Sequence, residues 1–276
     1  MDVEEVVRAI GGITLVGRLS GGEGAGAYEV VVDSGAHAVL KFDDGPHLDF
    51  ERAARVTSAL RARGYPAPAT IATGSVDAAR YALVELVRGA MPPELTPSLL
   101  AEVFELVELQ RDVGLPPRAP WLEDVITSVV DGRTGYCEHA AMSAHSEETR
   151  TLLDRLRAIA TAHADVDVPT DDIVHTDFHT DNMLADGDEI TAVIDWEGAT
   201  SGDVAFDLVT QALYAPQYRA ALMDAARTLT DPRALPLYAA HMVLRQVDWS
   251  IRHHTPIAVR WYLDEGAALL EAAAAG

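Results

Sequence analysis

The chain has 276 residues, 49% of them hydrophobic, which is enough to build the core of one large domain or two smaller ones. Its formal net charge of -22 opposes binding to nucleic acid and to anionic lipid, and it attracts cations, although the same charge could serve solubility alone. No apolar run approaches the roughly 20 residues of a membrane span, and the only cysteine, Cys137, excludes an internal disulfide.

The first ninety residues have a mostly β pattern. A loop with glycines at positions 21, 22, 24 and 26 separates the first two predicted strands. We predict strands at 13–19, 28–33, 36–42, 70–75 and 81–87, with one helix at 47–63.

After Gly89 the pattern changes to long amphipathic helices, which we predict at 96–112, 146–164, 204–214, 217–228, 232–252 and 255–274. One β-rich interruption lies at 173–194. The segment 88–93 breaks both periodicities, so we place the domain boundary there, with an N-terminal domain of residues 1–88 and a C-terminal domain of residues 89–276.

The only lysine of the chain is Lys41, against twenty arginines, and it ends an apolar run. An ammonium is a compact point charge, whereas a guanidinium is a wide planar fork. Lysine is a usual partner of phosphate where such a small charge is needed. The sequence therefore indicates a phosphate site at Lys41, unless this lysine remains on a solvated edge by chance.

The β-rich interruption carries a cluster of polar residues. Asp186-Gly187 predicts a hairpin turn, so Asn182, before the first strand, and Asp195, after the second, should meet at one end. Amide and carboxylate oxygens with phosphate oxygens suit Mg²⁺. Asp177 lies five residues before Asn182, where its carboxylate could orient a substrate hydroxyl and accept the proton.

Two other interpretations of this segment exist. On a strand, His175, Asp177, His179 and Asp181 would share one face, as in a zinc- or iron-dependent hydrolase. Alternatively, the aspartates only cap turns, which would require several polar positions to agree by accident.

The segment resembles the catalytic loop of protein kinases and, in finer detail, the aminoglycoside phosphotransferase family, which is itself similar to choline kinases. The resemblance rests on His175-Thr176-Asp177-Phe178-His179, Asn182, Ile194-Asp195-Trp196-Glu197, Gly202-Asp203 and Asp207-Leu208. Thr176 and Asp181 stand where the family commonly has glycine. The implied fold is α+β, a two-lobed protein-kinase-like fold with a small antiparallel β N-lobe and a larger, mainly helical C-lobe.

The resemblance also implies a nucleotide site for ATP or GTP with Mg²⁺. It makes Asp177 the catalytic residue and Asn182 and Asp195 the metal ligands. Its nucleotide-binding residues would be Lys41, its helix partner Glu51 (with Asp49 as a competitor), the loop glycines Gly22, Gly24 and Gly26, and the backbone of Glu85 and Val87 at adenine. His175, Asp203 and Asp207 would support the catalytic loop.

The acceptor site is expected on the last helices, where acidic and aromatic groups suit a cationic ligand. The candidate substrate residues are Asp181, Glu197, Asp248, Trp249, Trp261, Asp264 and Glu265. For Asp181, a role in attracting a cation and a role in capping the loop are equally open.

We therefore expect a small-molecule kinase that moves the γ-phosphoryl group of ATP or GTP to a hydroxyl of a cationic antibiotic, either an aminoglycoside or a basic peptide of the tuberactinomycin type, and so confers resistance. A kinase of choline, an amino acid or a sugar is the alternative with the same chemistry. A nucleotide-binding module without catalysis is an alternative of another class. The acidic start of the chain lacks the pattern of a signal peptide, so we expect a cytoplasmic protein. We expect no nucleic-acid or membrane partner, and we favour a monomer over an oligomer.

Overall fold

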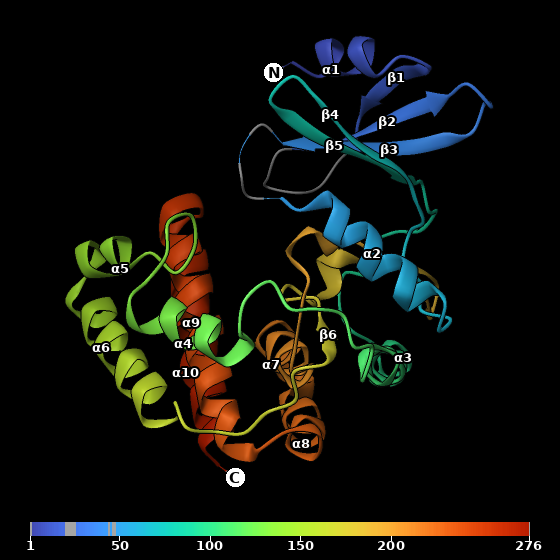
Figure 1. Cartoon of the computed structure of the whole chain (residues 1–276). Helices are drawn as coiled ribbons and strands as arrows, with labels where there is room; N and C mark the ends of the chain where they lie inside the picture. Colours follow the sequence, from blue (N-terminus) through green and yellow to red (C-terminus); the bar gives the residue numbers. More distant parts are fainter. Residues whose placement is uncertain (1, 20–25, 44, 46–47, 276) are drawn as a thin grey trace. The chain divides into compact units, whose positions relative to one another are not determined.

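The computed structural model describes residues 2–19, 26–43, 45 and 48–275 (Figure 1). Its contacts divide the chain into two compact units, each made of two segments. The first unit is Met1–Leu109 with Thr180–Ala199, and the second is Gln110–His179 with Thr200–Gly276. The domain boundary after residue 88 stays a prediction, while these contacts group the segment after the sheet and the central hairpin with the first unit.

The first unit contains a five-stranded sheet in which every neighbouring pair is antiparallel, as predicted. The strand order is β1-β2-β3-β5-β4, so β3 lies in the centre. Lys41 of β3 pairs with Ala27 on one side and with Ala82 on the other. The bounds are β1 Ile13–Arg18, β2 Ala27–Val32, β3 His37–Asp43, β4 Thr70–Val76 and β5 Ala79–Glu85.

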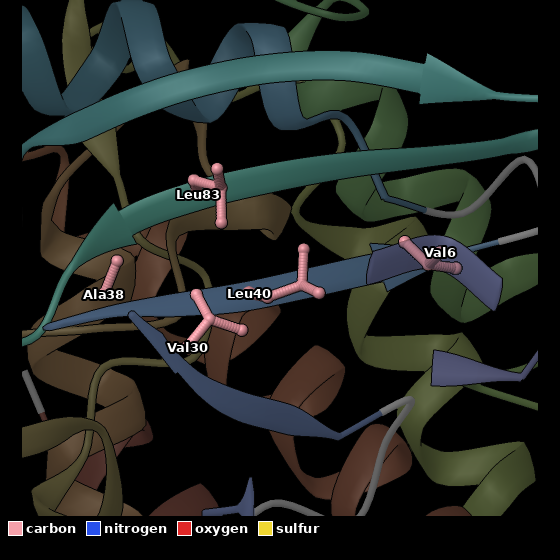
Figure 2. Packing of buried hydrophobic residues seen from close by; sticks show 5 residues of the cluster. All are labelled: Val6, Val30, Ala38, Leu40 and Leu83. Carbon is pink, nitrogen blue, oxygen red and sulfur yellow. The ribbon is translucent and has the colours of Figure 1, made fainter. Parts of the chain in front are cut away.

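A helix that we did not predict, α1 (Val3–Ile10), covers part of this sheet. Figure 2 shows the buried cluster in which Val6 of α1 joins the strand residues Val30, Ala38, Leu40 and Leu83. Asp2 and Glu5 form a capping box at its start. Without α1, the apolar residues of this face of β2 and β3 would be exposed to water.

The predicted hairpin is confirmed as β7 (Met183–Asp186) and β8 (Glu189–Val193). Gly187 in its turn has φ +62°, a value that glycine adopts without strain. Within the first unit the hairpin is fixed by backbone hydrogen bonds between Ala185 and Ala90, and Glu102 of α3 (Pro97–Gln110) accepts one from the N–H of Ile190. The remaining helical elements of this unit are α2 (Phe50–Arg61) and the short 3-10 turns η1 (Thr180–Asn182) and η2 (Trp196–Gly198).

The second unit is mainly helical, and α9 (Leu235–His253) contacts α4, α5, α6, α7 and α10. The other helices are α4 (Trp121–Val130), α5 (His139–His145), α6 (Glu147–Ala162), α7 (Ala205–Tyr214), α8 (Arg219–Leu229) and α10 (Pro256–Ala274), and the 3-10 turns are η3 (Pro216–Tyr218) and η4 (Pro232–Ala234). A two-stranded sheet of β6 (Asp172–Val174) and β9 (Thr200–Gly202) completes it. Helices α4 and α5 were not predicted. Among the described residues, no helix is both long and apolar enough to cross a membrane.

Candidate active site

Lys41 lies in a mostly buried position of the first unit, between two carboxylates. Its Nζ is 2.5 Å from Oδ1 of Asp195 and 2.8 Å from Oε1 of Glu197, and 17% of its side chain is exposed. Burial alone would lower the pKa of Lys41, but these two charges outweigh it and hold the pKa well above its ordinary value. The ammonium therefore stays charged at any physiological pH.

The expected pair between Lys41 and Glu51 is a wrong prediction. Glu51 is an exposed residue in the first turn of α2, whereas Glu197 reaches the ammonium. Asp49, the competing candidate, caps α2 by accepting a hydrogen bond from the N–H of Arg52. The helical spacing of residues 47–63 suggested Glu51, but it could not show that the segment after β8 brings Asp195 and Glu197 to Lys41.

The segment after β8 is held by Trp196, which separates these two acids in sequence. The Trp196 side chain is buried, donates from Nε1 to the Val193 carbonyl at 2.8 Å, and packs edge-on against Tyr65. Asp195 has φ +67°, a left-handed value that non-glycine residues adopt rarely. This turn lets the chain leave the strand sharply, so that Asp195 and Glu197 both reach Lys41.

Asn182 and Asp195 lie at the same end of the hairpin. The N–H of Ile194 donates to the Asn182 carbonyl at 2.9 Å, and Met183 pairs with Val193. Asn182 is buried, with 7% of its surface exposed. An amide and a carboxylate form the oxygen donor set that Mg²⁺ takes together with phosphate oxygens, so the residues present fit this ion.

The alternative of a transition-metal site loses its structural basis. Strand β6 ends at Val174, and residues 175–179 are not in a strand, so the alternating histidines and aspartates do not share one strand face. Within the described ranges, no three His, Cys, Asp or Glu side chains are grouped so that they could hold a metal.

The loop around Asp177 belongs to the second unit and is held through its backbone. Asp207 of α7 accepts hydrogen bonds from the N–H of His175 at 2.7 Å and of Thr176 at 3.0 Å. Gln110 donates to the same carboxylate at 2.8 Å and to the carbonyl of Ile173 at 2.9 Å. Burial raises the pKa of Asp207 to about 7, although the N–H donors favour its charged form.

The side chain of Asp177 faces a residue that the sequence analysis missed, Arg245 of α9. Its Nη2 is 2.9 Å from Oδ1 of Asp177, and Nε2 of His179 is 3.5 Å from the same oxygen. Burial works to raise the pKa of Asp177, but the Arg245 guanidinium and the His179 ring outweigh it, and the pKa lies well below its ordinary value. Asp177 is therefore a carboxylate at neutral pH.

Sequence comparison now decides the family: residues 16–238 match the phosphotransferase enzyme family, known as APH. The chain belongs to this family. Its membership confirms the predicted class of enzyme, a phosphotransferase with an alcohol group as acceptor. Among curated proteins there is no significant sequence match.

Solved structures agree with the family. The aminoglycoside phosphotransferase APH(4)-Ia, in a ternary complex with ADP and hygromycin B, superposes with a TM-score of 0.73 at 22% identity, over 99% of this chain and 98% of that chain. Choline kinase LicA from Streptococcus pneumoniae gives 0.62 at 13% identity, over 99% and 98%. A protein assigned as a fructosamine-3-kinase from Thermobifida fusca gives 0.61 at 20% identity, over 94% of each chain. These structures confirm the kinase-like fold.

Three of the acidic residues that this phosphotransferase was expected to offer to a cationic substrate, Asp248, Asp264 and Glu265, are paired with arginines. Asp248 is fully buried, and its Oδ2 lies 2.8 Å from Nη2 of Arg252. Glu265 pairs with Arg219 at 2.5 Å, and Asp264 pairs with Arg260 at 2.7 Å. The expectation that Asp248 contacts a cationic substrate is wrong, because its carboxylate is fully buried among the helices and pairs with Arg252 there.

Aromatic side chains are more accessible on the same helices. Trp261 is 39% exposed and packs edge-on against Tyr262. Trp249 stacks on the ring of His253, with the Arg252 guanidinium over the indole. Asp181 is exposed in η1. The roles of Trp249, Trp261 and Asp181 at a substrate stay predictions.

The other predicted nucleotide-binding residues are the loop glycines and the two residues expected at adenine. Gly22 and Gly24 lie outside the described residues, and Gly26 has φ +90° where the chain enters β2. Glu85 ends β5, and its carboxylate accepts from the N–H of Ala69; the contact of Glu85 and Val87 with adenine stays a prediction.

Asp203 follows Gly202 and is fully buried in the second unit. It accepts hydrogen bonds from the hydroxyl of Tyr238 at 2.7 Å, the hydroxyl of Thr230 at 2.5 Å and the N–H of Ala205 at 3.0 Å. Burial raises the pKa of Asp203 to about 6. These contacts give Asp203 a role in fixing the start of α7, the helix that carries Asp207.

Proposed function

We propose that this phosphotransferase moves the γ-phosphoryl group of ATP or GTP to a hydroxyl of a cationic antibiotic, an aminoglycoside or a basic peptide of the tuberactinomycin type, and so confers resistance. The observation that carries the kinase chemistry is the ammonium of Lys41 held by Asp195 and Glu197, together with the backbone-anchored loop of Asp177. The net charge of -22 and the likeness to APH(4)-Ia support the cationic acceptor.

Each residue would have one task. Lys41 neutralises the α- and β-phosphates, for which a compact charge is suited. Asn182 and Asp195 would hold Mg²⁺, which would supply positive charge to offset the negative charge that develops during transfer. The transition state of phosphoryl transfer is loose in most analyses, so these groups act mainly by position and charge.

Asp177 would orient the acceptor hydroxyl and receive its proton late in the reaction. Its low pKa makes it a weak base. A weak base is sufficient here, because in a loose transition state the hydroxyl oxygen has formed little bond to phosphorus when the leaving group departs.

A metabolite kinase is the second candidate. The pairing of Asp248, Asp264 and Glu265 with arginines leaves less free negative charge on α9 and α10 than a polycation would be expected to require. The likeness to a choline kinase and to a fructosamine-3-kinase agrees with an acceptor that carries one positive charge or none.

The test is a phosphoryl-transfer screen with the whole chain, Mg²⁺, and ATP or GTP. The acceptors are aminoglycosides, basic peptide antibiotics, choline, amino acids and sugars, and the product is detected by mass spectrometry. We expect one class to gain a phosphoryl group. In the matched variant Asp177→Asn, kcat should fall by at least about 100-fold, while nucleotide affinity stays close to that of the wild type.

The outcomes separate the candidates. Transfer to a cationic antibiotic, with raised tolerance of a sensitive host that expresses the chain, supports resistance. Transfer to a metabolite and to no antibiotic would contradict the proposed antibiotic acceptor, while it would support phosphoryl transfer to a hydroxyl. Nucleotide binding without transfer to any acceptor contradicts the proposal and favours a binding module.

A further inference from the structure

We propose that Arg245 is a positioning residue for Asp177, an inference that rests on the proposed kinase function. Its guanidinium makes two contacts with consecutive residues of the loop. Nη2 lies 2.9 Å from Oδ1 of Asp177, and Nη1 donates to the Thr176 carbonyl at 2.5 Å. A planar guanidinium can hold a carboxylate and a carbonyl at once in a fixed geometry, which a single ammonium does not reproduce.

The support behind Arg245 is rigid. The residue lies on α9, the helix that contacts five other helices of the second unit, and 23% of its side chain is exposed. Buried neighbours on the same helix, Leu244, Gln246 and Val247, lie on either side of it in the sequence. The position of the guanidinium is therefore set by the packing of the second unit.

The loop needs such support because Thr176 has φ +73°. For a β-branched residue this left-handed value is an outlier that persists only when its surroundings enforce it. Asp207 holds the N–H groups of His175 and Thr176, and Arg245 holds the carbonyl of Thr176. The peptide before Asp177 is thus fixed from both sides.

The direction of the carboxylate follows from the same contacts. Arg245 and His179 both approach Oδ1 of Asp177. Fixing one oxygen of a planar carboxylate, with its backbone already held, fixes the direction of the other. Arg245 thereby sets where Asp177 can meet an acceptor hydroxyl.

Several charged or titratable groups act on Asp177, and Arg245 is the strongest of those that favour the carboxylate. His179 and His175 act from the loop, and Tyr214 faces it from α7 with Tyr262 of α10 beyond. Loss of the guanidinium leaves burial, which raises the pKa of Asp177, less opposed. The acid limb of the activity profile, where the carboxylate is protonated, then moves to higher pH.

The experiment compares Arg245→Lys and Arg245→Met with a matched control, Arg227→Lys. Arg227 of α8 also contacts a carboxylate, Asp224, and a carbonyl, that of Ala272, and its side chain is 21% exposed, but none of its described contacts involves Asp177. Two quantities are measured on the whole chain: the pH dependence of kcat and KM with the best acceptor, and the titration of Asp177 by ¹³C NMR.

For Arg245→Met we expect kcat to fall by about 10- to 100-fold, with KM for the nucleotide nearly unchanged. Both the acid limb and the NMR titration of Asp177 should move up by about one pH unit or more. Arg245→Lys should recover part of kcat, because it keeps the charge but not the second contact. Arg227→Lys should match the wild type in kcat, in KM, and in the titration of Asp177.

The proposal is overturned if Arg245→Met keeps both the wild-type kcat and the wild-type titration of Asp177. If Arg245→Met does not fold, Arg245→Lys decides by the same two quantities. If the wild type phosphorylates no acceptor, the proposed function fails, and the NMR titration of Asp177 alone then shows whether Arg245 controls this carboxylate.

Discussion

At the scale of single residues, the candidate site contains two unusual backbone positions, Thr176 and Asp195, both with positive φ. Each lies next to or at a residue with a proposed task in catalysis. Strain of this kind costs on the order of 1–3 kcal/mol per residue and is kept where the surroundings enforce it. The contacts of Asp207 and Arg245 with the residues around Thr176 supply that enforcement.

Thr176→Gly tests whether the loop is strained. Glycine adopts φ +73° without a steric cost, so the free energy of unfolding should rise by roughly 0.5–1 kcal/mol, after the greater flexibility of glycine in the unfolded chain is deducted. The measurement is urea unfolding. As a control, Thr151→Gly on the exposed face of α6 should lower stability by roughly 0.5–1 kcal/mol. Equal losses in both variants would show that Thr176 carries no strain.

The sequence points to some candidate site residues and gives no sign of others. Lys41 stands out as the only lysine, and Asp177, Asn182 and Asp195 stand out by their spacing around a predicted hairpin and by the family resemblance; their tasks stay predictions. Glu51 was chosen as the partner of Lys41 by analogy, and the structure replaces it with Glu197. Arg245 gave no signal, because it is one of twenty arginines and its partner lies 68 positions earlier in the chain.

At the scale of elements, the strands and the long helices followed from periodicity and turn residues. Helix α1 was missed because its eight residues were treated only as an acidic end, although the Asp2 and Glu5 capping box was visible. Helices α4 and α5 are short, ten and seven residues, and they follow segments rich in proline and glycine. Such short elements depend on tertiary packing, which a single sequence does not show.

Gly202→Ala tests the packing that holds β9 beside Asp203. A Cβ at Gly202 would clash with the buried indole of Trp121, which also packs against Phe206 and Tyr238. Because a ring in such a core cannot move away freely, we expect a loss of about 1–3 kcal/mol in the free energy of unfolding.

The control for this change is Gly17→Ala in β1, where an added Cβ meets nothing within 4 Å. Its effect on stability should stay within about 0.5 kcal/mol. Urea unfolding of the whole chain measures both variants. If Gly17→Ala lowered the free energy of unfolding as much as Gly202→Ala, the packing argument would be contradicted, because the added methyl group at Gly17 meets no neighbouring atom.

At the scale of the whole molecule, the family and fold could be predicted because one continuous segment, residues 175–208, carries most of the specific residues. The acceptor could not be predicted in the same way. A single sequence does not show which acids pair with arginines, and in the structure Asp248, Asp264 and Glu265 do so. The net charge of the chain therefore does not show how much negative charge the last helices would offer to an acceptor.

The central claim is that this phosphotransferase transfers a phosphoryl group by means of the compact charge of Lys41. The most direct measurement is kcat/KM for the nucleotide in Lys41→Arg, with the acceptor that the screen identifies. We predict a fall of about 100-fold or more, while the unfolding transition stays cooperative, because a guanidinium keeps the charge but not the size. A Lys41→Arg enzyme with near wild-type kcat/KM would contradict the account.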